Sequence, residues 1–166
     1  MRLSFDSGGR RIDIEIGGVT ADSRAVRPGY LFAALPGSRA DGARFAADAV
    51  AKGAVAILAG EGAEISLPRP VPVLRDPDPR RRLALIAAEL HGRQPQTIVA
   101  VTGTSGKTSV ADFARQIFAA LGHKAASIGT IGVVKPDGAV YGSLTTPDPV
   151  ELMASLAGLA REGVTH

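Results

Sequence analysis

Short apolar runs alternate with amphipathic stretches along the first half of the chain, a pattern typical of an α/β domain. Arg11–Ile16 (RIDIEI) alternates polar and apolar side chains, as a half-exposed strand does. Gly29–Leu35 is apolar almost throughout and predicts a buried strand, and Val55–Leu58 and Val71–Leu74 predict two more strands. We therefore expect a small α/β domain at residues 1–91.

Two helices are expected in the same region, each with an apolar stripe at helical spacing. The first spans Gly42–Lys52 and is ended by Gly53, and the second follows an N-cap, Asp78, and begins at Pro79. The stripes consist of Phe45, Ala46, Ala49 and Val50 in the first helix, and of Leu83, Ile86, Ala87 and Leu90 in the second. Gly92–Pro95 then breaks the pattern and predicts a linker.

After the linker the pattern predicts a strand, a helix and a second strand. Thr97–Val101 is a short β-branched, apolar run, typical of a central parallel strand. Gly106–Leu121 predicts an amphipathic helix that Gly122 ends, and Lys124–Ile128 predicts the strand that completes a right-handed βαβ unit. The apolar stripe of this helix consists of Val110, Phe113, Ala114, Ile117, Phe118 and Leu121.

The last part of the chain predicts one more helix and the start of a strand. Asp148 supplies an N-cap and Glu151 the third position of a capping-box-like arrangement, for a helix at Pro149–Arg161. Gly163–His166 has the pattern of a strand that begins there. Because a doubly wound nucleotide-binding domain needs about five strands, we expect residues 92–166 to be the first part of a parallel-sheet domain in a longer protein.

Composition limits the class of protein. The chain has 166 residues, 45% of them apolar and 4% aromatic, so aliphatic side chains must dominate its core. It contains no cysteine, which excludes disulfides and thiolate metal sites and suits a reducing compartment. The N-terminus has no apolar run typical of a signal peptide, and the longest apolar run, Ala54–Ala59, is too short to cross a bilayer. We expect a soluble, cytoplasmic protein without membrane insertion.

The charge distribution does not favour a nucleic-acid partner, and the histidine spacing does not favour a metal site. The formal charge is +3, and the only dense basic cluster, Arg80–Arg82, has no aromatic residues interleaved with it. A solvated first helical turn explains this cluster better than a nucleic-acid surface does. His91, His123 and His166 lie far apart along the sequence without ligand spacing, so we assign them no metal role.

The segment VTGTSGKTSV, at Val101–Val110, carries the clearest chemistry. It places a glycine-rich turn between a predicted strand and a predicted helix, where backbone N–H groups and the positive end of the helix dipole bind phosphate. Gly103 and Gly106 permit the required backbone torsions. Lys107 can reach the β- and γ-phosphates of a nucleotide, and the Thr108 hydroxyl suits magnesium.

The alternative is a glycine-rich helix start whose lysine is only solvated. The strict pattern G-x-x-x-x-G-K-[ST] would also place glycine where this chain has Val101. Two observations favour phosphate binding. Strand, loop and helix occur in the required order, and lysine is scarce, with four lysines against fifteen arginines.

With these residues the chain resembles the Mur ligases, ATP-dependent enzymes that form amide bonds in peptidoglycan synthesis. Their phosphate loop has the form T-G-T-[NS]-G-K-[TS], as at Thr102–Thr108. Three further stretches resemble the branch of the family that adds the third residue of the stem peptide. They are TADSRAVRPGYLFAALPG at Thr20–Gly37, RADGARFAADAVAKGAVAIL at Arg39–Leu58 and TTPDP at Thr145–Pro149. The loop identifies the superfamily, and the TTPDP segment favours this branch.

The resemblance implies a role for each matching residue. Lys107 and Thr108 would be catalytic, with Thr108 as a magnesium ligand. ATP would bind at Gly103, Thr104, Ser105, Gly106, Lys107, Thr108 and Ser109. Ser105 stands where relatives more often have asparagine, which weakens the substrate contact expected there.

The same resemblance implies contacts to UDP-N-acetylmuramoyl-L-alanyl-D-glutamate. The uridine diphosphate part would bind at Ser23 and at Ser38, Arg39 and Ala40, and the muramoyl-peptide part at Thr145 and Thr146. Relatives often have His-Gln in place of Ser38-Arg39. Each segment also fits a plain structural interpretation: an Asx-type turn at Asp22–Arg24, a polar loop at Ser38–Gly42, and a helix start at Thr145–Pro149.

The family chemistry implies transfer of the ATP γ-phosphoryl group to a substrate carboxylate, giving an acyl phosphate that an amine then attacks. The added amino acid is expected to be meso-diaminopimelate rather than lysine, from its frequency in the family. Further magnesium ligands and the domain that receives the amino acid would lie beyond His166. We therefore expect the missing carboxy-terminal part of the enzyme as a partner, and no amide synthesis by this chain alone.

Three main alternatives remain open, and a fourth, a generic P-loop kinase, is disfavoured by the domain that precedes the loop. The ligase that adds D-Ala-D-Ala lacks a clear Thr-Thr-Pro counterpart, and folylpolyglutamate synthases usually have G-K-G-S where this chain has Gly106–Ser109. A non-catalytic nucleotide-binding module is the third. Affinity for a UDP-muramoyl peptide would separate a ligase of this branch from such a module.

Overall fold

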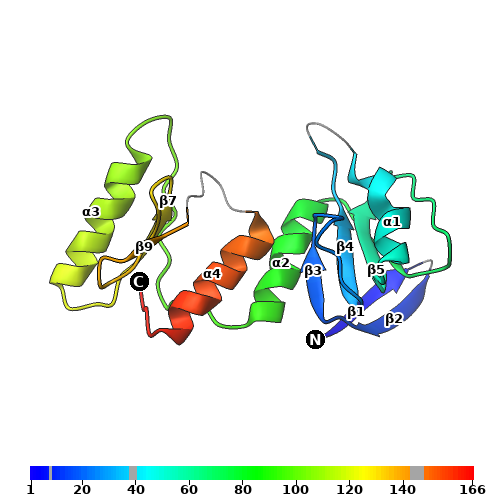
Figure 1. Ribbon diagram of the computed structural model, residues 1–166, viewed down its shortest axis with the longest axis horizontal. Coiled ribbons are helices and arrows are strands. Elements are labelled where there is room, and N and C mark those ends of the chain that lie inside the picture. The colour runs from blue at the N-terminus through cyan, green and yellow to red at the C-terminus, as the bar shows by residue number, and fades with distance from the viewer. Residues whose placement is uncertain (8, 38–40, 143–147) are drawn as a thin grey trace. The chain divides into compact units, whose positions relative to one another are not determined.

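The computed structural model describes residues 1–7, 9–37, 41–142 and 148–166, and it divides into two compact units, Met1–Leu90 and His91–His166. Each unit builds its own sheets, and Figure 1 traces the chain through both. Among the residues described, none of the helices combines the length and the apolarity needed to cross a membrane.

Parallel strand pairing organises the first unit. Its main sheet has the order β3-β4-β5-β6 and is parallel throughout, with β3 at Gly18–Thr20, β4 at Tyr30–Ala34, β5 at Ala56–Gly60 and β6 at Val73–Asp76. The central strands β4 and β5 have a hydrogen-bonded neighbour on each side, so their apolar side chains are buried on both faces. The predicted α/β class with a parallel sheet is confirmed. The strands predicted at β4, β5 and β6 are also confirmed, with ends shifted by one or two residues.

Alternation along β4 and β5 divides the core of this unit between two faces. One face forms a cluster with helix α1 (Ala46–Ala51) that contains Phe32, Ala34, Ile57, Ala59, Ala46, Ala49 and Val50. Leu31, Ala33 and Leu58 point to the opposite face and are fully buried. Helix α2 (Pro79–His91) buries Leu83, Ile86 and Ala87 in the same unit.

The first predicted helix begins differently from the prediction. Gly42–Phe45 forms a 3₁₀ turn, η1, which Asp41 caps by accepting a hydrogen bond from Ala43 N at 3.0 Å. A 3₁₀ helix has roughly 3.0 residues per turn instead of about 3.6. Phe45 therefore leaves the buried stripe and is 41% exposed. Its predicted place on the apolar face of the helix is wrong, whereas Ala46, Ala49 and Val50 are buried as predicted.

Helix α2 begins as predicted. Asp78 Oδ1 accepts a hydrogen bond from Arg81 N at 3.0 Å, which is the geometry of an N-cap. In the first turn, Arg80 Nη2 donates to the carbonyl oxygen of Pro36. One member of the Arg80–Arg82 cluster therefore ties a distant loop to the helix.

An antiparallel hairpin opens the chain. Strand β1 (Arg2–Ser7) pairs with β2 (Arg10–Glu15), from Arg2 opposite Glu15 to Ser7 opposite Arg10. The half-exposed strand predicted at Arg11–Ile16 is confirmed as β2, one residue earlier. Its partner β1 was not predicted, although Leu3 and Phe5 alternate with polar residues and are buried on one face.

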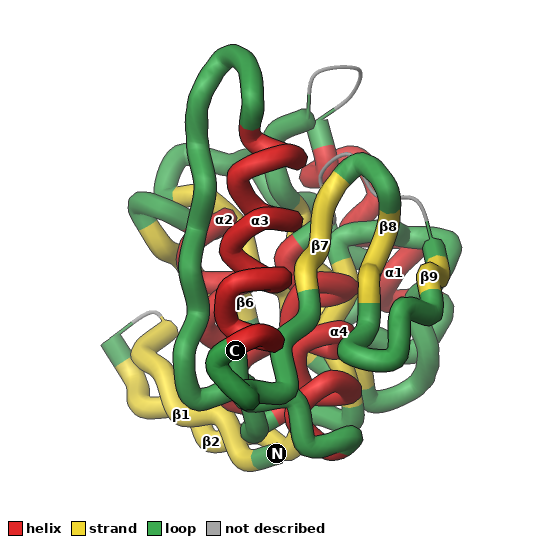
Figure 2. Tube along the Cα trace, turned by 90° about the vertical axis from the view of Figure 1, so that its left-hand side faces the viewer, coloured by secondary structure: helices red, strands yellow, loops and turns green. Residues whose placement is uncertain are grey.

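The second unit contains two helices and an antiparallel sheet. Helix α3 spans Lys107–Ala120 and α4 spans Pro149–Arg161, both within a residue of their predicted ends. The sheet has the order β7-β8-β9, with β7 at Ser127–Gly129, β8 at Gly132–Val134 and β9 at Val140–Tyr141. Figure 2 shows the β7–β8 hairpin standing beside α3.

The predicted central strand at Thr97–Val101 is wrong in this structure. A backbone hydrogen bond joins Thr97 N to Thr165 O at 3.0 Å, but in the described part of the chain no ladder of bonds follows it. Figure 2 shows residues 92–106 as a loop that runs along α3. Without strand neighbours, Ile98 and Val99 stay 52% and 57% exposed.

The predicted βαβ unit is also replaced by other pairings. Strand β7 begins at Ser127 rather than Lys124 and pairs antiparallel with β8. The residues just before it bond to the end of the chain instead: Thr165 N donates to Lys124 O at 2.8 Å, and Ala126 N donates to His166 O at 3.0 Å. The segment predicted as the start of a strand, Gly163–His166, thus has backbone hydrogen bonds to Thr97 on one side and to residues 124–126 on the other, but it forms no strand.

Helix α3 is amphipathic as predicted, but its apolar stripe is not covered. Phe113 and Ile117 are each 60% exposed, and Val110 and Leu121 are exposed as well. None of the residues of α3 is buried. In the described part of the chain, no parallel sheet of the kind that such a helix covers in an α/β domain packs on this stripe.

Gly42 offers a direct test of the first unit, because the chain approaches itself there. Gly42 N donates to Leu35 O at 2.9 Å, and a Cβ added at position 42 would lie 2.6 Å from Leu35 O and 2.7 Å from Leu35 N. We expect Gly42→Ala to lower the free energy of unfolding by about 1–3 kcal/mol, because the backbone must shift. Urea denaturation measures this change.

Gly62→Ala is the matched control, because a Cβ there would meet nothing within 4 Å. It should change the free energy of unfolding by no more than about 1 kcal/mol. Equal stability of the two variants would contradict the close approach at Gly42.

Candidate functional site

The predicted phosphate loop forms an exposed turn at the N-terminus of α3. Gly106 is the N-cap residue with φ +76°, and Gly103 has φ +147°, and both are torsions that favour glycine. Residues Thr102–Lys107 are all exposed. The turn is therefore open to solvent, as a phosphate site at a helix N-terminus has to be.

Lys107 lies across this turn. Its Nζ donates a hydrogen bond to the carbonyl oxygen of Gly103, four residues earlier. The ammonium group is thus held over the loop rather than extended away from it. A phosphate bound to the amides would be within reach of this charge after a rotation of the exposed side chain.

Thr108 makes a contact that the sequence does not predict. Its Oγ1 lies 3.0 Å from Oγ1 of Thr130, which sits in the turn between β7 and β8. Thr130 is 22 positions further along the chain. No local signal relates two threonines at that separation, so only the folded hairpin reveals the pair.

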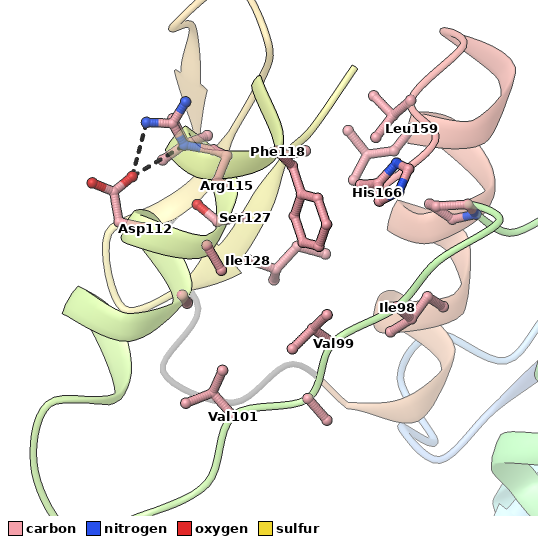
Figure 3. Close-up of a pocket in the computed structure, with 18 of the residues that line it drawn as sticks. Ile98, Val99, Val101, Asp112, Arg115, Phe118, Ser127, Ile128, Leu159 and His166 are labelled. Atoms are coloured by element: carbon pink, nitrogen blue, oxygen red, sulfur yellow. Dashed lines mark hydrogen bonds and ion pairs between the residues drawn. The ribbon is translucent and has the colours of Figure 1, made fainter. Parts of the chain in front are cut away.

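A cavity of about 450 Å³ begins beside these two threonines. Segments 95–101 and 126–134, helix α3 and Leu152, Leu156 and Leu159 of α4 line it. Figure 3 shows Phe118 and Val99 pointing into it from opposite sides. Aliphatic and aromatic side chains dominate the lining, and Lys107 and Thr108 place polar groups at the end beside the loop.

A charged pair on α3 also lines this cavity. Asp112 Oδ1 accepts hydrogen bonds from Arg115 Nη2 at 2.9 Å and from Arg115 Nε at 3.0 Å (Figure 3), and Gln116 donates to Oδ2. The bonds from Arg115, and then that from Gln116, lower the pKa of the Asp112 carboxyl. Asp112, one helical turn after Thr108, is therefore ionised, and the positive charge of Arg115 balances its negative charge.

The hydroxyl oxygen of Thr108 suits a hard cation. Magnesium takes oxygen ligands and usually completes its shell with water and substrate phosphates, so one protein hydroxyl beside a phosphate loop fits it. In the described part of the chain, no three histidine, aspartate or glutamate side chains converge to hold a metal ion without such help.

The histidines are closer in space than in sequence. The rings of His123 and His166 stack with centroids 4.0 Å apart, and Phe118 lies 4.6 Å from His166. Burial first, and the charge of His123 second, lower the pKa of His166. His123 and His166, which lie far apart in the sequence, thus meet in space.

Ser23, the candidate uridine contact, lies in a turn of the first unit. Its carbonyl oxygen accepts a hydrogen bond from Lys52 Nζ at 2.9 Å, and Lys52 also pairs with Asp48 at 2.8 Å. Asp22 Oδ1 accepts from Arg24 N at 2.9 Å. The alternative interpretation of this segment, an Asx-type turn after a strand, is thus confirmed as its local structure.

Five predicted contact residues lie outside the described residues: Ser38, Arg39, Ala40, Thr145 and Thr146. The neighbours of these segments are described. Pro36 forms an isolated bridge with Asp41. Asp148 caps α4 by accepting from Val150 N at 2.7 Å and from Glu151 N at 3.0 Å, so the predicted helix start is confirmed.

Two family descriptions match the chain in sequence order. "Mur ligase family, catalytic domain" matches residues 15–91, and "Mur ligase middle domain" matches residues 101–166. The chain belongs to the Mur ligase family. The second match begins at the first residue of the phosphate-loop segment.

Curated relatives of this Mur ligase chain carry the name UDP-N-acetylmuramoyl-L-alanyl-D-glutamate--2,6-diaminopimelate ligase. The protein of that name from Brucella melitensis is 61% identical over 154 residues, which are 93% of this chain and 31% of the relative. The one from Rhizobium meliloti is 58% identical over 164 residues, 99% of this chain and 33% of the relative. The predicted resemblance to this branch is confirmed, and the chain spans about a third of the length of these relatives.

A solved structure also supports the assignment to this family. One titled as a structure of UDP-N-acetylmuramoyl-L-alanyl-D-glutamate--2,6-diaminopimelate ligase superposes with a TM-score of 0.79 and 27% identity. The match covers 99% of this chain and 35% of that one.

The turn that carries Ser23 yields a prediction about Asp22. Hydrogen bonds from the Arg24 side chain, then from the Arg24 backbone N–H, hold the pKa of Asp22 below its ordinary value of 3.8. Any stability from this carboxylate is therefore present above pH 3.8 and is lost as the pH falls through the folded-state pKa. Arg24→Leu should raise the pKa of Asp22 but leave it below 3.8, because the backbone bond remains.

Carboxyl NMR titration measures this pKa. Asp13 is the internal control, because hydrogen bonding from Ser4 and the charge of Arg2 lower its pKa independently of Arg24. An unchanged Asp22 pKa in Arg24→Leu would show that the side chain does not hold the turn.

Proposed function

We propose that this chain binds the sugar-nucleotide substrate and the ATP phosphates in a ligase that adds diaminopimelate to UDP-N-acetylmuramoyl-L-alanyl-D-glutamate during peptidoglycan synthesis. The observation that carries the proposal is the combination of an exposed, glycine-shaped turn at the N-terminus of α3 with a match to ligases of that name over both units.

In this proposal ATP transfers its γ-phosphoryl group to the substrate carboxylate, giving an acyl phosphate and ADP. The amine of the diamino acid then attacks the acyl carbon, the amide bond forms, and phosphate leaves. A carboxylate and an amine do not condense in water without such activation. The residues of this chain have to hold the triphosphate in line with the carboxylate and to neutralise its charge.

The loop residues divide this task. The backbone N–H groups of Gly103–Gly106 and of the first turn of α3, including Ser109, face the phosphates. Lys107 exchanges its hydrogen bond with the Gly103 carbonyl for the β- and γ-phosphates. Thr108 offers its hydroxyl to magnesium, which supplies charge neutralisation at the same phosphates when bound.

The sugar-nucleotide contacts belong to other segments. We assign the uridine diphosphate part to Ser23 and to Ser38, Arg39 and Ala40, and the muramoyl-peptide part to Thr145 and Thr146. The Lys52 hydrogen bond to the Ser23 carbonyl supports the first assignment, because it fixes the backbone of that turn while leaving the hydroxyl to other partners.

The uncovered apolar surface of the second unit supports a role within a longer enzyme. Ile98, Val99, Phe113 and Ile117 are each more than half exposed and lie beside the cavity or on α3. About two thirds of each curated relative lies outside the matched stretch. We expect the additional polypeptide of a full-length ligase to cover this surface and to complete the active site.

Replacement of Lys107 tests the role proposed for the loop. In a full-length ligase that carries this sequence, Lys107→Ala should lower kcat by about 10²–10³-fold, the cost typical of losing one preorganised charge or donor at a reacting centre. Phosphate release in the presence of ATP, the nucleotide-peptide and the diamino acid measures it. Lys124→Ala removes an equal charge in the same unit and should leave kcat near that of the unaltered enzyme. Near-normal turnover by Lys107→Ala would refute the assignment.

The 166-residue chain by itself provides a further test. It should form no amide bond, because the groups that receive the amino acid are expected elsewhere in the enzyme. Mass spectrometry of the nucleotide-peptide product, with a full-length relative as positive control, tests this. Measurable ligase turnover by the 166-residue chain would overturn the proposed division of labour.

A further inference from the structure

We infer that Thr130 is a positioning residue for Thr108: its Oγ1 accepts the proton of the Thr108 hydroxyl and so turns a lone pair of Thr108 toward the magnesium ion of the nucleotide. This inference rests on the proposed function and assigns a role to a residue outside the phosphate-loop motif. It comes from the 3.0 Å contact between the two hydroxyl oxygens.

The donor chemistry of a hydroxyl requires such a partner. A threonine hydroxyl has one proton and two lone pairs. When a lone pair binds a cation, the proton must point elsewhere, and the cation makes the O–H group a stronger donor. Inside a helix this acceptor is often a backbone carbonyl of the preceding turn, but Thr108 is the second residue of α3 and has no helical turn before it. Thr130 Oγ1, at 3.0 Å, is an acceptor within reach.

The hairpin that carries Thr130 is well fixed within its unit. Gly129 pairs with Gly132, so Thr130 and Ile131 form a two-residue turn. Gly132 has φ +110°, and a Cβ there would overlap the carbonyl oxygens of Tyr141 and Gly142, which places β9 directly against the hairpin. Val133, on β8, is 1% exposed and packs with Leu159 and Val164. The Thr130 hydroxyl therefore has a defined place even though its own side chain is exposed.

Among the described residues, the charged side chains nearest to the pair along α3 have other partners. Thr108 is half-buried at the end of the cavity, and Lys107 is bonded to Gly103. Asp112, one turn further along α3, accepts hydrogen bonds from Arg115 and Gln116. Among the described contacts, the hydrogen bond between the two hydroxyl groups therefore determines the orientation of the Thr108 hydroxyl.

The test measures ATP binding to the full protein as a function of Mg²⁺ concentration, by isothermal titration calorimetry, for four proteins. These are the unaltered protein, Thr130→Val, Thr130→Ser and Thr165→Val. Thr130→Val removes the acceptor and keeps the shape, and Thr130→Ser restores a hydroxyl. Thr165→Val is the matched control, because it removes a hydroxyl that bonds to Lys124 O in the same unit.

We expect Thr130→Val to need about 10-fold more Mg²⁺ for half-maximal enhancement of ATP binding, the loss typical of removing a group that orients a metal ligand. ATP affinity in EDTA should stay unchanged, because the loop amides and Lys107 are intact. Thr130→Ser and Thr165→Val should match the unaltered protein. Thr130→Ala gives the same comparison if the valine variant does not fold.

Three results would overturn the inference. An unchanged Mg²⁺ requirement in Thr130→Val would refute it while leaving the proposed function intact. Equal weakening of ATP binding with and without Mg²⁺ would show that Thr130 only supports the loop. Absence of ATP binding by the unaltered protein would refute the proposed function, and this inference with it.

Discussion

Hydrogen bonding between neighbouring strands is the constraint on which both units depend. An apolar strand can be buried on both faces only when its backbone N–H and C=O groups find partners along both edges. In the first unit β4 and β5 have such partners, and their side chains are buried. In the second unit Thr97–Val101 has the same kind of composition but forms no ladder with any described residue, so Ile98, Val99 and much of the stripe of α3 stay exposed.

The candidate site illustrates how local and distant interactions combine. The turn at Gly103–Gly106 depends on glycine torsions and on a helix N-terminus, which are properties of a few consecutive residues. The orientation of the Thr108 hydroxyl depends on a hairpin more than twenty positions away. A short motif can therefore indicate a phosphate site, but it does not identify every residue that orients the groups of that site.

The same distinction explains what could be predicted from the sequence. The bounds of α4 and the cap at Asp148 were predicted correctly, because capping chemistry involves neighbouring residues. The antiparallel sheet β7-β8-β9 and the partner of β2 were missed, because strand pairing is decided by distant residues. For the site, Gly103–Ser109 could be named from the motif alone, whereas Thr130 had no sequence signal and the roles of Ser23 and Thr145 came from resemblance.

The pairing pattern of the first unit has a consequence for the order of events during translation. Every strand pair described there, from the hairpin β1–β2 to β5–β6, joins residues within Met1–Leu90. Ribosomes add about 5–20 residues per second, and amino-terminal domains fold first as they emerge. This unit can therefore close its sheets within seconds of leaving the exit tunnel, while the chain that follows is still being made.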